Sequence, residues 1–385
     1  MNIKDWVTNL PRQYKTHRNA DLPLEEYVAF YHKKFKRVTI GCSFDPDLVD
    51  QMYERENQVK NISLEKKLNI LKVLIHDFGI TEIRLGIKWN RVVNEKGIFD
   101  FSYYHDYLDY CLTHKVNVCL NIGPIKTFGW PEEFVPQYIL DKDKQVNLDI
   151  NKNSIIGKYS LEYLDILLKH LQLSYSKQKL NYIKIIQPEN EAFNIFGKQK
   201  LVLSDEYLIE VIKKINGVFP DKKILLNSSE TRDTKSIVRV LKKIVDSKSI
   251  LYKNFIIGIN YYYNLPKFLK LPLLGPVDNI TFSNLLQKNT HMENIKDAQL
   301  LGYGIEVSEA QFEQWGRVYL SPGNSHHEAK YLLARCVDNI LDTNNESIIR
   351  LWGLERYAKR KIENTLTSDQ QQNLQLISAI NAIAQ

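Results

Sequence analysis

Short β-branched segments alternate eight times with segments of helical period, and this alternation constrains the fold more than any other feature of the chain. The strand-like runs span residues 37–44, 82–89, 116–123, 182–189, 223–229, 255–262, 303–309 and 347–353. Between them, apolar residues recur at helical spacing. Strands separated by helices imply right-handed crossovers and a parallel sheet. Eight such units predict an α/β fold, a single (β/α)8 TIM barrel.

The remaining segments are consistent with one barrel. An amphipathic helix is expected near residues 24–35, so residues 1–36 are interpreted as an N-terminal helical extension and residues 37–385 as the barrel with a C-terminal helix. The first strand is followed by no glycine-rich phosphate-binding turn, which disfavours an open dinucleotide-binding sheet. A length of 385 residues lies within the range of single barrels with insertions.

Charge and hydropathy exclude several classes of partner. The chain has 52 Lys+Arg and 45 Asp+Glu, and the positive residues occur in short pairs on helical patterns without interleaved aromatic residues. We therefore expect solvated helix faces and no nucleic-acid partner. No run of about 18 apolar residues occurs, so we expect no membrane partner and a cytoplasmic protein, with a removed export signal as the alternative. A homo-oligomer is possible.

The four cysteines form no CxxC motif, and at least two lie in apolar strand or helix patterns. Buried reduced thiols are therefore favoured over disulfides or a zinc site. The adjacent histidines His326 and His327 follow Ser325 and precede Glu328, which is the pattern of a helix capping box. A helix start is favoured there over metal ligation.

Polar residues at the C-terminal ends of the strands are the candidates for function, because the loops at that face of a barrel build its site. They are Asp45, Arg84, Asn121, Glu189, Asn190, Glu191, Asn227, Glu230, Asn260, Tyr262 and Glu309. Histidine is absent from these positions. A Ser-His-Asp site needs an imidazole, and a metal site needs converging histidine or carboxylate ligands. Neither site is expected, and no cofactor or metal is predicted.

Carboxylates from two separate strands remain, and they suit the hydrolysis of a glycosidic bond. That reaction needs one carboxyl that is protonated and another that is ionised. Glu191 and Glu309, at the ends of the fourth and seventh strands, are the candidates. For either residue alone, a structural salt bridge is the alternative interpretation.

Four of the five tryptophans lie at or just after strand ends, where their rings would provide platforms for the apolar faces of a sugar. They are Trp89, Trp130, Trp315 and Trp352. Packing between the barrel and its helices is the alternative for each tryptophan taken singly.

These motifs resemble the retaining β-glycosidases of glycoside hydrolase clan A, over about residues 37–355. The segment IIQPENEAFN (185–194) is similar to one in family 35 β-galactosidases and their relatives. That similarity implies that Glu191 is the acid/base and that Asn190 holds the sugar 2-hydroxyl. The segment IEVSEAQFEQW (305–315) resembles one whose first glutamate is the nucleophile, which implies that role for Glu309.

The resemblance implies a retaining glycoside hydrolase that cleaves β-glycosidic bonds in oligo- or polysaccharides by double displacement with two glutamates. Its partner would be a β-linked carbohydrate, and the similarity to family 35 implies a β-galactosidase-like enzyme. The alternative is a barrel that binds carbohydrate, or transfers glycosyl groups, with little hydrolysis. The sugar, the linkage and exo or endo action stay open.

Alternation along the strands favours particular glutamates. Glu189 and Glu191 share parity, but Glu191 lies nearer the mouth and directly follows Asn190. Glu306 has the opposite parity to Glu309 and is disfavoured on that ground.

Other residues are expected to support the nucleophile. The guanidinium of Arg84 would lower the pKa of Glu309, and a structural ion pair is the alternative. Asn260 and Tyr262 share one face of the sixth strand, and the phenol would hold Glu309 ionised. The segment 263–279 is expected to shape the aglycone side of the cleft, or to pack against a partner subunit.

Overall fold

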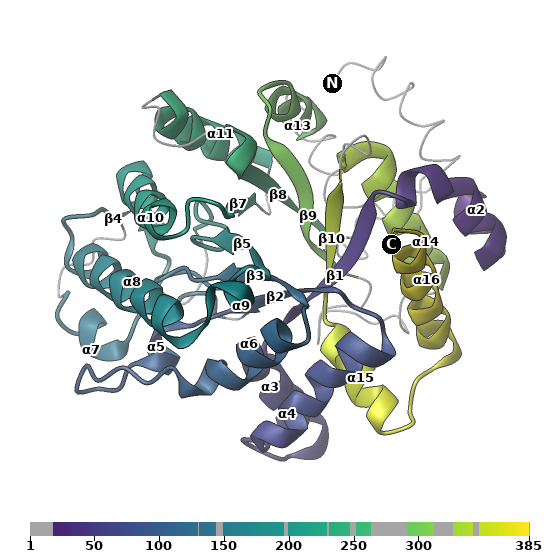
Figure 1. Ribbon diagram of the computed structural model, residues 1–385, viewed down its shortest axis with the longest axis horizontal. Helices are drawn as coiled ribbons and strands as arrows, with labels where there is room; N and C mark the ends of the chain where they lie inside the picture. The colour runs from purple at the N-terminus through teal and green to yellow at the C-terminus, as the bar shows by residue number, and fades with distance from the viewer. Residues whose placement is uncertain are drawn as a thin grey trace.

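The computed structural model describes residues 18–129, 131–143, 149–195, 199–228, 231–246, 252–262, 291–311, 326–341 and 346–384. Within these ranges eight parallel strands close into a barrel in the order β1-β10-β9-β8-β7-β5-β3-β2 (Figure 1). The strands are β1 (Val38–Phe44), β2 (Glu82–Gly86), β3 (Asn117–Asn121), β5 (Ile183–Gln187), β7 (Lys223–Ser228), β8 (Phe255–Tyr262), β9 (Gly304–Gln311) and β10 (Ser347–Trp352). Each coincides with a run identified from the sequence, so the predicted (β/α)8 barrel is confirmed.

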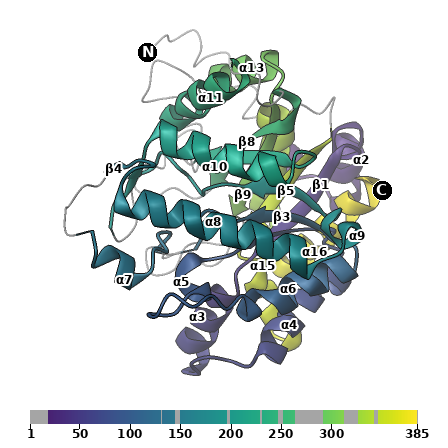
Figure 2. The same cartoon turned by 60° about the vertical axis from the view of Figure 1, so that its left-hand side comes forward.

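Helices surround the barrel in the two views of the ribbon (Figures 1 and 2). The longer ones are α3 (Pro46–Asn57), α4 (Leu64–Lys72), α6 (Ser102–Thr113), α8 (Ile155–Ser174), α10 (Asp205–Val218), α11 (Thr231–Asp246), α13 (His291–Leu300), α14 (His326–Arg335) and α15 (Leu354–Ile362). Short helices are α5 (Trp89–Val92), α7 (Gln137–Leu140) and α9 (Lys177–Leu180). Serine side chains cap the starts of α4, α8 and α10, where they accept hydrogen bonds from free backbone N–H groups.

The start of α14 at His326 agrees with the expected helix start, although Ser325 lies outside the described residues. None of the helices in the described part of the chain has the length and apolar composition that crossing a bilayer requires. A small parallel pair, β4 (Asp149–Ile150) and β6 (Val202–Leu203), lies outside the barrel and was not expected.

Helix α2 (Leu24–Phe35) packs beside the C-terminal helix α16 (Ser368–Ala384) (Figure 1). Asn381 in α16 joins this pair to the barrel, because its side-chain amide accepts from Ile40 N at 2.8 Å and donates to Ile40 O at 3.1 Å. The two ends of the chain therefore stabilise β1 from the outside.

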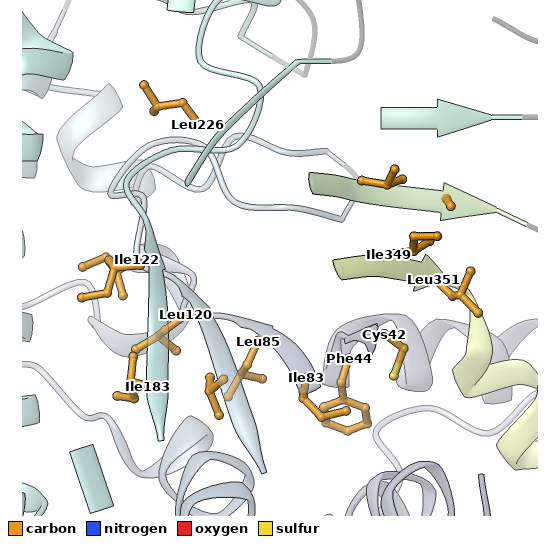
Figure 3. Packing of buried hydrophobic residues seen from close by; sticks show 14 of the residues in the cluster. Cys42, Phe44, Ile83, Leu85, Leu120, Ile122, Ile183, Leu226, Ile349 and Leu351 are labelled. Atoms are coloured by element: carbon orange, nitrogen blue, oxygen red, sulfur yellow. The ribbon is translucent and has the colours of Figure 1, made fainter. Parts of the chain in front are cut away.

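The apolar core lies mainly between strands and helices, where outward residues such as Ile83, Leu85 and Leu120 pack (Figure 3). A second, small cluster of inward residues consists of Cys119, Ile185, Leu225 and Ile256. All four cysteines are buried and free, as the sequence predicted.

Much of the barrel interior is polar. Near the N-terminal ends of the strands, Arg350 donates to Glu82 at 3.0 Å and to Glu306 at 2.8 Å. The sequence argument assumed that Glu306 and Glu309, having opposite parity, lie on opposite faces of their strand. This assumption is wrong, because both side chains contact partners inside the barrel. The pairing of β8 with β9 shifts between Val307 and Glu309, and this β-bulge places an extra residue between them.

Candidate active site

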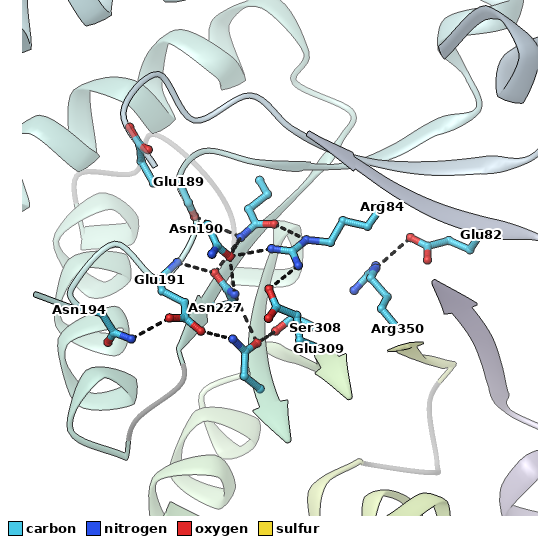
Figure 4. A network of polar contacts seen from close by, with 12 residues as sticks. Glu82, Arg84, Glu189, Asn190, Glu191, Asn194, Asn227, Ser308, Glu309 and Arg350 are labelled. Carbon is cyan, nitrogen blue, oxygen red and sulfur yellow. Dashed lines mark hydrogen bonds and ion pairs between the residues drawn. The ribbon is translucent and has the colours of Figure 1, made fainter. Parts of the chain in front are cut away.

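Arg84 occupies the centre of the C-terminal end of the barrel and is fully buried. Its three nitrogens donate to Glu309 Oε1 at 2.5 Å, Asn190 Oδ1 at 2.7 Å and Gln187 Oε1 at 2.8 Å (Figure 4). The ring of Phe128 packs 4.5 Å from the guanidinium carbon. Arg84 thus joins Glu309 of β9 to Asn190, which lies in the segment after β5.

The carboxylate of Glu191 is held by two side-chain amides. Asn260 donates to Oε1, and Asn194 donates to Oε2 at 2.8 Å (Figure 4). The backbone N–H of Glu191 donates to Asn227 Oδ1 at 2.8 Å. Glu191 has a left-handed φ of 45°, and a turn closed by Asn194 N donating to Glu191 O at 2.9 Å maintains it. These contacts fix the direction of the carboxylate.

A chain of amides links the two glutamates. Gln187 donates to Asn227 at 2.7 Å, and Asn227 donates to Asn190 at 2.9 Å and to Asn260 at 3.3 Å. The hydroxyl of Ser308 donates to Asn260 Oδ1 at 2.6 Å, which directs the Asn260 amide nitrogen toward Glu191. A fully connected polar network of this kind restricts the positions of its members.

Glu189 faces away from this network (Figure 4). It is fully buried, and it accepts hydrogen bonds from Lys126 N at 2.6 Å and Tyr207 Oη at 3.1 Å. Burial raises the pKa of Glu189 to about 8, against the opposing effect of these hydrogen bonds. Glu189 therefore anchors the loop after β3, and this geometry supports Glu191 over Glu189 as the candidate acid/base.

The predicted aromatic platforms have different environments. Trp352, at the end of β10, is partly exposed, and its ring lies edge-to-face with Phe128 at 5.6 Å. Trp89 requires a correction, because it is buried and its ring stacks on Tyr163 of α8 at 5.2 Å. Trp89 therefore belongs to the layer between barrel and helices. Trp130 and Trp315 lie outside the described residues.

The other predicted residues lie at or near the site. Asn260 reaches Glu191, as described, and Asn121 ends β3, where its Oδ1 accepts from Gly123 N at 3.0 Å. Tyr262 ends β8, but its side chain lies beyond what the structure describes, as does the segment 263–279.

Sequence reasoning did not assign site roles to Gln187, Asn194, Asn227 and Ser308. Gln187 and Asn227 carried a usable signal, since both are polar residues at strand ends. Within the described ranges, no three His, Cys, Asp or Glu side chains are grouped so that they could hold a metal ion.

No protein-family model matches the chain, and no curated protein sequence matches it. Solved structures do share its architecture. Xylanase 10C from Cellvibrio japonicus, in complex with xylopentaose, is 11% identical with a TM-score of 0.55, and the match covers 90% of this chain and 67% of that chain. An exo-β-1,4-mannosidase from Opitutaceae bacterium strain TAV5 is 14% identical with a TM-score of 0.55, covering 90% of this chain and 60% of that chain.

Xylanase 10B from Thermotoga petrophila RKU-1, in complex with xylobiose, is 12% identical with a TM-score of 0.51, and the match covers 86% of both chains. Similarity at such low identity establishes the common barrel fold. It does not establish activity, because one barrel fold supports many chemistries.

Proposed function

We propose that this chain is a retaining glycoside hydrolase of clan A, which cleaves β-glycosidic bonds in oligo- or polysaccharides by double displacement. The observation that carries the proposal is the convergence of Glu191 and Glu309 on one network, through Arg84 and the amides of Asn190, Asn227 and Asn260, at the C-terminal end of a barrel. The barrel shared with xylanases and a mannosidase adds support.

In the proposed first step, Glu309 attacks the anomeric carbon, while Glu191 donates its proton to the glycosidic oxygen and the aglycone leaves. The ion pair with Arg84 fixes the position of the Glu309 carboxylate for this attack. In the second step, a water molecule gives its proton to Glu191 and attacks the same carbon, the bond to Glu309 breaks, and the β-configuration is restored.

The neighbouring residues would orient the sugar. Asn190, whose Oδ1 is held by Arg84 and Asn227, would bind the 2-hydroxyl through its amide nitrogen. Trp352, which is partly exposed, would contact the apolar face of the ring, with the buried Phe128 packed edge-to-face against it. Specificity for β-galactosides rests on the sequence motifs alone. The preferred sugar is therefore to be identified by measuring the hydrolysis of aryl β-xylosides, β-mannosides, β-glucosides and β-galactosides.

The roles are tested by removing each glutamate. Glu309→Ala should lose at least about 10⁴-fold in kcat, because no group remains to attack the anomeric carbon. Glu191→Ala should still be glycosylated by activated aryl glycosides and then stall, and azide should restore turnover with a β-glycosyl azide as product. Glu189→Gln is the matched control and should show no azide rescue.

Two outcomes would contradict the proposal: full activity in both alanine variants, or a wild-type protein that cleaves no substrate of the panel. A product mixture dominated by transfer to acceptor sugars would instead identify the chain as a transglycosylase, which shares the covalent intermediate.

A further inference from the structure

Two adjacent glutamates in the loop after β3 have opposite environments. The carboxylate of Glu133 accepts hydrogen bonds from the backbone N–H groups of residues 199–201, with Leu201 N at 2.7 Å. Glu132 Oε2 is also buried, yet it has no hydrogen-bond partner among the described residues. A buried unsatisfied polar atom costs about 1–3 kcal/mol, and a ligand that hydrogen-bonds to Glu132 Oε2 would remove this cost.

The backbone holds Glu132 in place without help from its side chain. Its φ of 69° is left-handed, a conformation that costs a non-glycine residue about 1–2 kcal/mol. Glu132 N donates to Gly129 O at 2.7 Å, and Thr127 N donates to Glu132 O at 3.2 Å. Two residues on, the ring of Phe134 packs 4.8 Å from the ammonium of Lys88. Strain of this kind is typical of sites where a side chain is positioned in advance for a ligand.

The loop that carries Glu132 lies beside the candidate active site, because Lys126 pairs with Glu133 across this loop and Lys126 O accepts from Asn190 N at 2.9 Å. Burial, followed by the negative charges of Glu191 and Glu309, raises the pKa of Glu132 to about 9, while Lys126 and Arg84 oppose the rise. After burial, these four charges have the largest effects on Glu132. At neutral pH Glu132 is therefore an uncharged acid, with one O–H donor and an acceptor oxygen.

We propose that Glu132 is a substrate-binding residue, whose carboxyl exchanges hydrogen bonds with a hydroxyl group of a neutral sugar beside Glu191 and Glu309. This inference rests on the proposed glycosidase function. An uncharged acid can both donate to a hydroxyl and accept from it without repelling the two catalytic carboxylates. A uronic acid at this position would add another negative charge and is disfavoured.

The test compares Glu132→Ala, Glu132→Gln and the control Glu95→Gln, a change at an exposed loop residue. With the best substrate of the panel at pH 7, Glu132→Ala should raise KM about tenfold with a smaller change in kcat, as expected for one lost hydrogen bond. Glu132→Gln should lose less, because the amide still donates and accepts. The wild type should also show an extra decline in kcat/KM near pH 9 that Glu132→Gln lacks, since an amide does not ionise. The decline common to both proteins belongs to the proton donor of the reaction.

Equal kinetics in all proteins, or a glutamine variant as impaired as the alanine variant at every pH, would overturn the role of Glu132 while leaving the hydrolase proposal intact. A wild type inactive on the whole panel would defeat the hydrolase proposal. The role of Glu132 in sugar binding would then be tested separately, by calorimetric titration with xylo- and manno-oligosaccharides. Binding about tenfold weaker in Glu132→Ala than in the wild type supports this role. Equal binding by the two proteins, or no binding by the wild type, overturns it.

Discussion

Two fully buried arginines inside the barrel, Arg350 and Arg84, make similar ion pairs in successive layers, since Arg350 lies level with Gly41 of β1 and Arg84 with Ser43. Arg350, toward the N-terminal ends of the strands, donates to the two carboxylates of Glu82 and Glu306. Arg84, toward the C-terminal ends, donates to the carboxylate of Glu309 and to two neutral amide oxygens. Figure 4 shows Arg84 in its network and, beside it, Arg350 with Glu82.

The difference lies in what surrounds the carboxylates. Glu82 is fully buried, and this burial raises its pKa to about 7, with Arg350 opposing the rise and Glu306 adding to it. When Glu82 is protonated, the positive charge of Arg350 and the negative charge of Glu306 cancel. The cluster of the three side chains then has no net charge, which lowers the cost of burying it. Glu309 lies beside Glu191 and Asn190, at the end where the loops meet. One arginine therefore stabilises the scaffold, and the other organises the candidate chemistry.

The largest expected effect comes from Arg350→Met, which should lower the free energy of unfolding by about 3–5 kcal/mol, because Glu306 would keep a buried charge without its partner. Urea denaturation measures this loss. The folded fraction should retain the wild-type kcat. The control Arg239→Met removes an exposed ion pair with Asp205 and should cost less than about 1 kcal/mol.

Arg84→Met is the counterpart in the layer nearer the mouth and should differ from Arg350→Met in its effect on kcat. Its kcat should fall about 10²-fold, because Glu309 and Asn190 lose a common anchor. Its free energy of unfolding should also fall, because the side chain of Glu309 is about as buried as that of Glu306, so kcat is the measurement that separates the two variants. Equal stability losses in the two variants, with equal kcat values, would abolish the distinction between the two arginines.

The pH dependence of stability tests the protonation of Glu82. Its folded pKa of about 7 lies above the ordinary value of 4.5, so between these pH values the folded protein retains a proton that the unfolded chain loses. The free energy of unfolding should therefore fall as the pH rises through this window, by roughly 3 kcal/mol from this group. Below pH 4.5 the stabilisation by Glu82 is fully present and should not change further with pH. Glu82→Gln should lack this component.

Thermal or urea unfolding from pH 4.5 to pH 7 checks the difference between wild type and Glu82→Gln. Glu65→Gln, at an exposed position of α4, should follow the wild type in parallel. A wild type that becomes more stable than Glu82→Gln as the pH rises would show that Glu82 is ionised in the folded state.

The barrel was predictable because its strands are buried on both faces and read as short β-branched runs between amphipathic helices. The two-residue strands β4 and β6 are too short to carry such a pattern. Trp89 was misplaced for a related reason: β2 ends at Gly86, and the chain turns into α5 at Trp89, so a strand-end rule does not fix the direction of this side chain.

The site was predictable in its motifs and less so in its geometry. The Asn190-Glu191 pair and Glu309 follow strands that end at one face, so their convergence followed from the fold. The bulge in β9 could not be predicted from the sequence. A register shift depends on how β9 pairs with β8 and β10, and the alternation of residues within one strand does not reveal this pairing. Glu132 gave no sequence signal, since nothing in the sequence separates it from Glu133.

The smallest expected effect concerns Ser308, which the bulge places in β9 between Glu306 and Glu309. Its hydroxyl orients Asn260, which in turn holds Glu191, so Ser308→Ala should lower kcat about three- to tenfold, the equivalent of one neutral hydrogen bond. The control Ser347→Ala removes a 3.5 Å contact to Ile305 O near the start of β10 and should leave kcat unchanged.

A double-mutant cycle with Asn260→Ala sharpens the assignment. If Ser308 acts through Asn260, the double variant should be no slower than Asn260→Ala alone, because the two residues form one path to Glu191. Additive losses would show that Ser308 affects the site by another route, such as the shape of the bulge itself. The pH dependence of unfolding measured for Glu82 should be unchanged in Ser308→Ala, since the hydroxyl belongs to the network of Arg84 and not to that of Arg350.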